Sequence, residues 1–119
     1  MQIFERDVAL VSVVLSTFNR CGVLKDTISS IEAQDYPSLE IVIVNDGSSD
    51  GTEAFLKQFK CNKKFHVITN PRNLGLQASL NIGISQAKGM YIARIDDHDL
   101  WTRKDKISKQ VQYLQTHPR

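Results

Sequence analysis

A mostly apolar segment of the chain ends in a dense group of acids. Residues 91–95 are followed within four positions by Asp96, Asp97 and Asp99, together with His98. Carboxylates this close repel one another unless a cation, a basic partner or water offsets their charge. The end of a strand is also where open α/β sheets bind their ligands. The pattern predicts either a metal or ligand site or a solvated acidic loop.

The composition is typical of one globular domain. The chain has 119 residues, of which 41% are hydrophobic and 24% charged. Its 15 basic and 13 acidic residues give a net charge of +2, which is too balanced to predict a nucleic-acid partner. Cys21 and Cys61 match neither a disulfide framework nor a zinc spacing and are expected to be free thiols. The apolar run at residues 8–15 is too short to span a membrane, so a cytoplasmic location is expected.

The fold class follows from the alternation of two periodicities. Short β-branched runs alternate with segments of helical period, which is the pattern of β-α units around a mostly parallel sheet. Strands are expected at residues 8–15, 39–44, 65–69 and 90–95, and helices near residues 23–31, 54–59, 77–87 and 107–114. The nearly continuous apolar run at 8–15 predicts a central strand buried on both faces. We expect a doubly wound α/β fold, a three-layer sandwich with strand order 3-2-1-4.

Three polar segments follow strands in this arrangement, at residues 16–20, 45–48 and 96–99. With right-handed crossovers they converge beside the point where the strand order reverses, which is where a nucleotide would bind. The chain contains neither a Gly-x-Gly-x-x-Gly motif nor a Gly-Lys-Ser/Thr loop. Phosphate groups are therefore expected to be bound through a metal.

Four segments, in order, carry recognisable signatures: residues 11–20, residues 40–52, residues 73–75 with 81–83, and the acidic loop with Trp101. They resemble the successive signatures of the family 2 glycosyltransferases of the GT-A fold. The resemblance implies an inverting transfer of a sugar from a nucleotide-sugar donor to a saccharide or glycolipid acceptor. It also implies a role in synthesis of cell-envelope polysaccharide, lipopolysaccharide or glycoconjugates, helped by Mg²⁺ or Mn²⁺ at an Asp-x-Asp motif.

The donor-binding residues are assigned through this resemblance. Thr17, Phe18 and Asn19 are expected to line the base and ribose, with Phe18 serving either as a stacking platform or as core. Asp46 is expected to accept a hydrogen bond from a uracil-like or guanine-like edge, with a UDP-linked donor favoured. Gly47 would allow close approach, although an Asp-Gly turn is the structural alternative.

Three further residues complete the predicted donor site. Asn73 and Gly75 resemble a donor-site loop, but a turn before a helix would explain them equally well. Asp97 is expected to contact the ribose or a metal-bound water.

The metal site departs from the family pattern. Alignment of residues 95–101 places His98 where the second Asp of Asp-x-Asp usually lies, so Asp96 and His98 are the predicted ligands. An imidazole ligand shifts the expected preference from Mg²⁺ toward Mn²⁺. Asp99 would orient a ligand from the outer shell or cap the following helix.

A catalytic base is missing from these assignments. In the family that carboxylate comes from a segment beyond the acidic loop, and Asp105 is interpreted as the solvated face of the last helix. Residues 1–119 are therefore expected to form one nucleotide-sugar-binding domain, truncated before the acceptor-binding part and inactive alone. The full-length protein would lie in the cytoplasm or peripherally at the inner face of the membrane.

Two other classes compete with this interpretation. A non-catalytic nucleotide-binding module could dimerise through its exposed sheet edge, which makes a homodimer a second expectation. A receiver-type signalling domain also combines a doubly wound sheet with an acidic Mg²⁺ site. Its acids follow the first and third strands, where this chain has residues 16–20 and 70–73 instead.

Overall fold

The computed structural model describes residues 8–117 and contains four strands and four helices in that range. In chain order these are β1 (Val11–Thr17), α1 (Cys21–Glu32), β2 (Leu39–Asn45), α2 (Thr52–Gln58), β3 (Lys64–Thr69), α3 (Leu76–Gln86), β4 (Tyr91–Arg94) and α4 (Lys106–Thr116). Every element expected from the sequence forms, with ends that differ by a few residues. Residues 1–7 and 118–119 of the predicted domain lie outside the described range.

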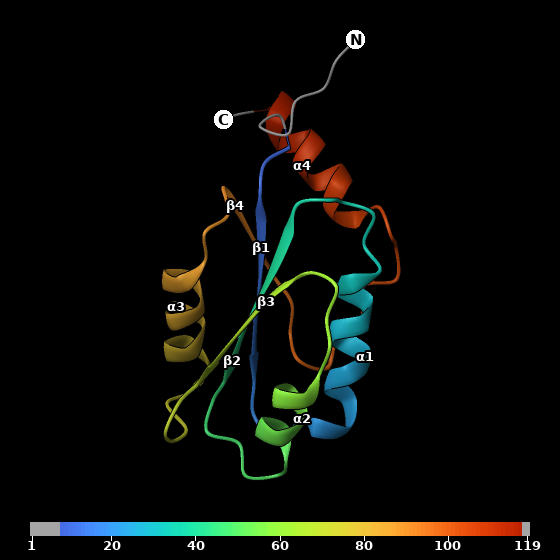
Figure 1. Ribbon diagram of the computed structural model, residues 1–119. Coiled ribbons are helices and arrows are strands. Elements are labelled where there is room, and N and C mark those ends of the chain that lie inside the picture. The colour runs from blue at the N-terminus through green and yellow to red at the C-terminus, as the bar shows by residue number, and fades with distance from the viewer. Residues whose placement is uncertain (1–7, 118–119) are drawn as a thin grey trace.

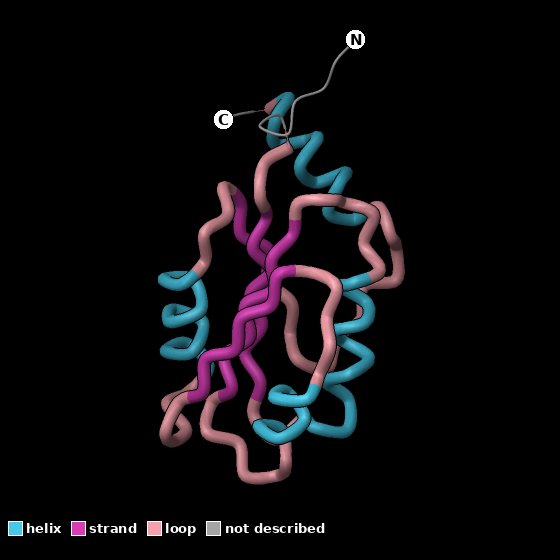
Figure 2. The backbone as a smooth tube through the Cα atoms, in the orientation of Figure 1, coloured by secondary structure: helices cyan, strands magenta, loops and turns pink. Residues whose placement is uncertain are grey.

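The four strands form one parallel sheet in the order β3-β2-β1-β4, as predicted (Figure 1). The register pairs Thr17 with Asn45 and Asn45 with Thr69. The carboxyl ends of β1, β2 and β3 therefore lie at one edge of the sheet, from which the loops emerge together (Figure 2).

Helices cover both faces of the sheet, which gives the predicted three layers. Figure 1 shows α1 and α2 on one face and α3 on the other. Because successive strand residues point to opposite faces, the apolar runs of β1 and β2 supply two cores. One core contains Val13 and Ile41 with Ile28 of α1, and the other contains Val14 and Val42 with residues of α3. This two-sided burial explains why β1 and β2 are nearly continuous apolar runs.

A buried acid fixes the turn that leads into β4. Glu40 is 1% exposed, and its carboxylate accepts hydrogen bonds from the Ser12 hydroxyl (2.5 Å) and the Lys88 N–H (2.7 Å). The Ser12 hydroxyl also accepts the Gly89 N–H at 2.8 Å. Burial alone would raise the pKa of Glu40, but these hydrogen bonds outweigh it and hold that pKa below its usual range. The start of β4 is thereby fixed against β1 and β2.

Two expectations concern features other than the sheet. Cys21 and Cys61 are free and partly buried, as the sequence predicted. Within residues 8–117, no helix is both long and apolar enough to cross a bilayer.

Candidate functional site

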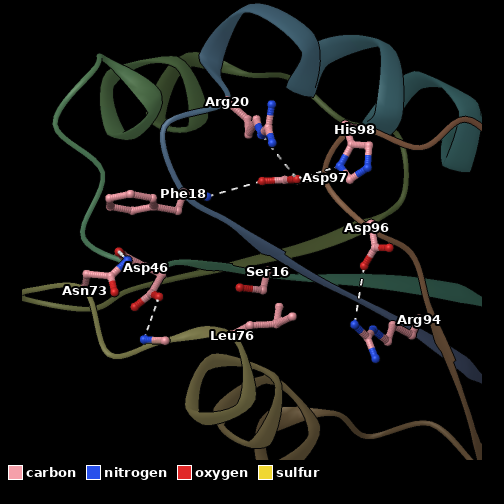
Figure 3. Close-up of a pocket in the computed structure, with 11 residues that line it drawn as sticks. Ser16, Phe18, Arg20, Asp46, Asn73, Leu76, Arg94, Asp96, Asp97 and His98 are labelled. Atoms are coloured by element: carbon pink, nitrogen blue, oxygen red, sulfur yellow. Dashed lines mark hydrogen bonds and ion pairs between the residues drawn. The ribbon is translucent and has the colours of Figure 1, made fainter.

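A cleft of about 450 Å³ opens at the carboxyl edge of the sheet (Figure 3). The ends of β1 and β4, the loops after β1, β2 and β4, and the segment that leads into α3 line it. The lining residues are Ser16, Phe18, Arg20, Asp46, Asn73, Gly75, Leu76, Arg94, Asp96, Asp97 and His98. The predicted convergence of the three polar segments is therefore confirmed. The convergence follows from the parallel register, which ends β1 and β2 at the same level.

The predicted donor-lining residues at the end of β1, residues 17–19, differ in where their side chains lie. Phe18 is 43% exposed on the wall of the cleft, so it is not part of the core. Thr17 is 1% exposed, and its hydroxyl has no hydrogen-bond partner within residues 8–117. Ser16 lines the cleft instead. Strand alternation puts Ser16 and Phe18 on one side and Thr17 on the other, so the Thr17 side chain is not among those that line the cleft.

Asn19 connects two loops and does not line the cleft. Its N–H donates to Ser48 Oγ at 2.9 Å, and its Oδ1 accepts the Ser49 N–H at 2.8 Å. Its φ of 53° lies in the left-handed region, which asparagine tolerates better than most residues. Asn19 therefore joins the loop after β1 to the loop after β2, and the next residue, Arg20, reaches the cleft.

Asp46 has the most strongly bonded side chain of the site. It is 2% exposed and accepts hydrogen bonds from Asn70 Nδ2 (3.0 Å), the Leu74 N–H (2.7 Å) and the Gly75 N–H (3.0 Å). Burial alone would raise its pKa, but the hydrogen bonds from Leu74, Asn70 and Gly75 outweigh burial and keep the pKa low. Asp46 is therefore an ionised carboxylate that holds the segment before α3 at the cleft.

Of the predicted donor-site residues Gly47, Asn73 and Gly75, two line the cleft and one does not. Asn73 and Gly75 line the cleft, and Asn73 Nδ2 donates to the Asp46 carbonyl at 3.4 Å. Gly47 does not line it. Its φ is 72°, and a Cβ there would overlap the backbone of Arg72 and Asn73. The close approach that Gly47 allows is that of the chain's own backbone.

Asp97 joins the acidic loop to the loop after β1. Its side chain is 14% exposed, and its Oδ2 accepts the Phe18 N–H at 3.3 Å. Its Oδ1 lies 3.8 Å from Arg20 Nε and 3.3 Å from His98 Nδ1. These contacts span the cleft wall between two loops that are far apart in sequence (Figure 3).

The predicted metal ligands both line the cleft but have different partners. Asp96 Oδ1 lies 3.4 Å from the Arg94 guanidinium, whereas the His98 ring faces Asp97 (Figure 3). Within residues 8–117 no three His, Cys, Asp or Glu side chains gather closely enough to hold a metal ion by themselves. Ions that bind nucleotide phosphates usually take only one or two protein ligands. Asp96 and His98 could supply such a pair of ligands, one carboxylate and one imidazole.

The alternative that Asp99 caps the following helix is wrong, and Asp105 immediately precedes that helix instead of lying on it. Asp105, not Asp99, occupies the N-cap position of α4, and it pairs with Arg103 Nε at 3.0 Å. Asp99 is exposed outside the cleft, and its N–H donates to the Asp96 carbonyl at 3.1 Å. Asp99 lies too far from α4 to cap it, because residues 100–105 run along α1 before α4 begins.

Two arginines of the cleft were not assigned from the sequence. Arg20 and Arg94 place guanidinium groups in a site where phosphate binding was attributed to metal alone. A guanidinium can bind phosphate oxygens in a bidentate manner. The sequence does hint at a role for Arg94, because it is a charged residue at the end of a mostly apolar strand. Nothing in the sequence marks Leu76, at the start of α3, as a residue of the site.

Comparison with known proteins identifies the same fold and sequence pattern. Residues 12–119 match the family described as glycosyl transferase family 2. The Bacillus subtilis protein named "Putative teichuronic acid biosynthesis glycosyltransferase TuaG" is 36% identical over 106 residues, which cover 88% of this chain and 42% of that protein. The Staphylococcus epidermidis poly-β-1,6-N-acetyl-D-glucosamine synthase is 38% identical over 86 residues, covering 72% of this chain and 21% of the synthase.

A solved structure gives the corresponding spatial match. The mannosyltransferase PcManGT from Pyrobaculum calidifontis, in complex with GDP-Man and Mn²⁺, superimposes with a TM-score of 0.84 at 25% identity. The match covers 89% of this chain and 32% of the mannosyltransferase. The chain thus spans less than half the length of each of these three proteins.

Proposed function

This chain belongs to glycosyl transferase family 2, and we propose that it binds the nucleotide-sugar donor of an inverting glycosyltransferase. The observation that carries the proposal is the cleft itself. It places a half-exposed aromatic ring, an ionised buried carboxylate, two guanidinium groups and an Asp-x-His pair along one sheet edge. The acceptor would be a saccharide or glycolipid in polysaccharide synthesis, in keeping with the names of the B. subtilis and S. epidermidis relatives.

The base and ribose would bind at the Phe18 and Asp46 end of the cleft. A base can stack on the exposed Phe18 ring. A carboxylate offers about four acceptor positions, and three N–H donors of the chain use Asp46. The Ser79 hydroxyl also hydrogen-bonds to Asp46, so a base N–H would share one of these acceptor positions. Uracil and guanine both present an N–H beside a carbonyl, so a UDP-linked donor is proposed first and a GDP-linked donor second.

The diphosphate would bind between Arg20, Arg94 and the acidic loop. Asp96 and His98 would hold a divalent ion, with Mn²⁺ favoured over Mg²⁺, and the Mn²⁺ in the mannosyltransferase complex supports a metal in this fold. When bound, such an ion neutralises negative charge on the leaving nucleoside diphosphate. Arg94 would then be released from Asp96 and be available to phosphate oxygens. Asp97 would keep Phe18 and Arg20 aligned with the acidic loop.

This donor site is tested by titrating the purified chain with UDP, GDP, CDP and ADP, with and without Mn²⁺, in a calorimeter. We expect UDP or GDP to bind and Mn²⁺ to strengthen the binding. ADP should bind more weakly, because adenine does not present the same N–H edge. If a folded chain binds none of the four nucleotides with or without Mn²⁺, the proposal is wrong.

The general base of the reaction is proposed to lie outside residues 1–119. Each carboxylate that lines the cleft has another role: Asp46 holds the segment before α3, Asp97 joins the two loops, and Asp96 is proposed to bind the metal. None is left to remove a proton from an acceptor hydroxyl.

The 119-residue chain is therefore expected to bind a donor without multiple turnovers. The check is a sugar-transfer assay with UDP-linked donors and a panel of saccharide acceptors, alongside a longer form of the protein. Repeated transfer by the 119-residue chain would place the base within this cleft and contradict the assignment.

A further inference from the structure

A polar stripe on α1 holds the backbone of the acidic loop. Thr27 and Ser30 lie on α1, and Gln34 lies two residues beyond its end. Spacings of three and four residues place these side chains on one side of a helix. Thr27 is 0% exposed and Gln34 is 4% exposed. Polar side chains buried to this degree need partners, and all of theirs lie between residues 97 and 107 or on α1 itself.

Each member of the stripe bonds to main-chain atoms. The Thr27 hydroxyl donates to the carbonyls of Asp99 (2.8 Å) and Asp97 (3.2 Å). Ser30 Oγ accepts the Trp101 N–H at 3.1 Å.

Gln34 continues the pattern at the far end of the loop. Its Nε2 donates to the Arg103 carbonyl at 2.6 Å, and its Oε1 accepts the Ile107 N–H at 3.0 Å. Residues 95–105 form neither helix nor strand, so their backbone groups need such partners. The side chains of the stripe supply these hydrogen-bond partners, as a neighbouring strand or a helical turn would in regular secondary structure.

The position of Thr27 has a specific consequence for His98. The two carbonyls that Thr27 binds flank His98, and a hydrogen bond from the Asp99 N–H to the Asp96 carbonyl (3.1 Å) closes a turn around it. Both carbonyls are thus held toward α1. The His98 side chain is 57% exposed and lines the cleft. We propose that Thr27 is a positioning residue, which holds the Asp96–Asp99 turn so that Asp96 and His98 face the diphosphate.

The inference rests on the proposed metal and donor site, but it makes a narrower claim. Thr27 contacts the acidic loop, whereas Asp46 and the segment before α3 have partners of their own. Loss of the Thr27 hydroxyl should therefore impair metal-dependent binding and leave metal-free nucleotide binding nearly unchanged. A residue that only stabilised the fold would affect both.

The test compares Thr27→Val, which keeps the shape and removes the hydroxyl, with Thr27→Ser, which keeps the hydroxyl. Ser29→Ala on the exposed side of α1 is the matched control. We expect Thr27→Val to lower Mn²⁺ affinity in the presence of UDP by about 10-fold or more, as is typical when support for a metal ligand is lost. Thr27→Ser and Ser29→Ala should bind Mn²⁺ about as tightly as the wild type, because the first keeps the hydroxyl and the second lies on the exposed side of α1.

Amide hydrogen exchange gives a second measurement that does not depend on ligand binding. In Thr27→Val, the amides of Asp99 and Trp101 should exchange faster while those of β2 remain protected. If Thr27→Val does not fold, the milder change Ser30→Ala is used instead, and it should accelerate exchange of the Trp101 amide.

The inference would be overturned if a folded Thr27→Val had the metal affinity and the amide exchange rates of the wild type. It would also be overturned if Thr27→Ser lost as much metal affinity as Thr27→Val. If the wild type binds no metal or nucleotide, the proposed function fails, and exchange alone decides the role of Thr27.

Discussion

Replacing Asp46 with alanine is expected to lower both donor affinity and stability. The substitution removes an acceptor from a base edge, which should weaken nucleoside diphosphate binding by about 1–3 kcal/mol, or roughly 5- to 150-fold. It also leaves Asn70 and the N–H groups of Leu74 and Gly75 without their buried acceptor. The free energy of unfolding should therefore fall by about 3 kcal/mol, near the top of the usual range for single substitutions.

Urea unfolding followed by the fluorescence of the single tryptophan, Trp101, measures the stability change, because Trp101 packs against the core. Asp46→Asn should have a smaller effect than Asp46→Ala, since its amide oxygen can still accept two N–H groups while its NH₂ opposes a third donor. Asp26→Ala, on the exposed surface of α1, is the control for loss of an acidic charge. Wild-type stability and affinity in Asp46→Ala would show that these hydrogen bonds contribute nothing.

The same carboxylate makes the stability difference depend on pH. The folded-state pKa of Asp46 lies below its ordinary value, so ionised Asp46 stabilises the fold above the unfolded pKa of about 3.9. That contribution is lost as the pH falls through the lower folded-state pKa. The gap in unfolding free energy between wild type and Asp46→Asn should therefore be constant near neutrality and narrow on acidification. A gap that widened in acid would contradict the direction of the pKa shift.

Changing His98 is expected to alter metal selectivity more than any other substitution in the cleft. Loss of a residue that only supports a metal ligand typically lowers metal affinity by roughly 10- to 100-fold. His98→Ala removes a ligand itself, so it should lower Mn²⁺ affinity in the presence of UDP by at least that much. His98→Asp restores a ligand but offers oxygen instead of nitrogen. It should recover much of the affinity and improve Mg²⁺ relative to Mn²⁺, because Mg²⁺ prefers oxygen ligands.

Titrations of Mn²⁺ and Mg²⁺ against the three forms, at fixed UDP and neutral pH, measure these effects. His117→Ala, immediately after α4, is the control, because it removes an imidazole outside the cleft. If His98→Ala, His98→Asp and the wild type have the same affinities for both metals, His98 does not bind the ion. Coordination would then be assigned to Asp96 and the diphosphate.

Much of this protein could be predicted from the order of its residues alone. A three-layer sandwich around a parallel sheet follows from the apolar runs of β1 and β2 and the helical periods between them. Each periodicity buries apolar groups in only one kind of element, a strand or a helix. Polar segments after those strands determine which edge carries the site, since parallel strands all end on the same side. The positions of Phe18, Asp46 and the acidic loop in the cleft follow from that rule.

Tertiary structure alone decided how the individual side chains are used. Thr17 is buried while Ser16 faces the cleft, because strand alternation selects every second residue once the end of β1 is fixed. Gly47 makes room for the backbone of Arg72, and Asp46 bonds to residues 70–75, across distances in sequence that no local pattern reports. Thr27 holds the turn around His98 for the same reason. Hydrogen-bond partners distant in sequence depend on the packing of whole elements, so they become visible only when the fold is known.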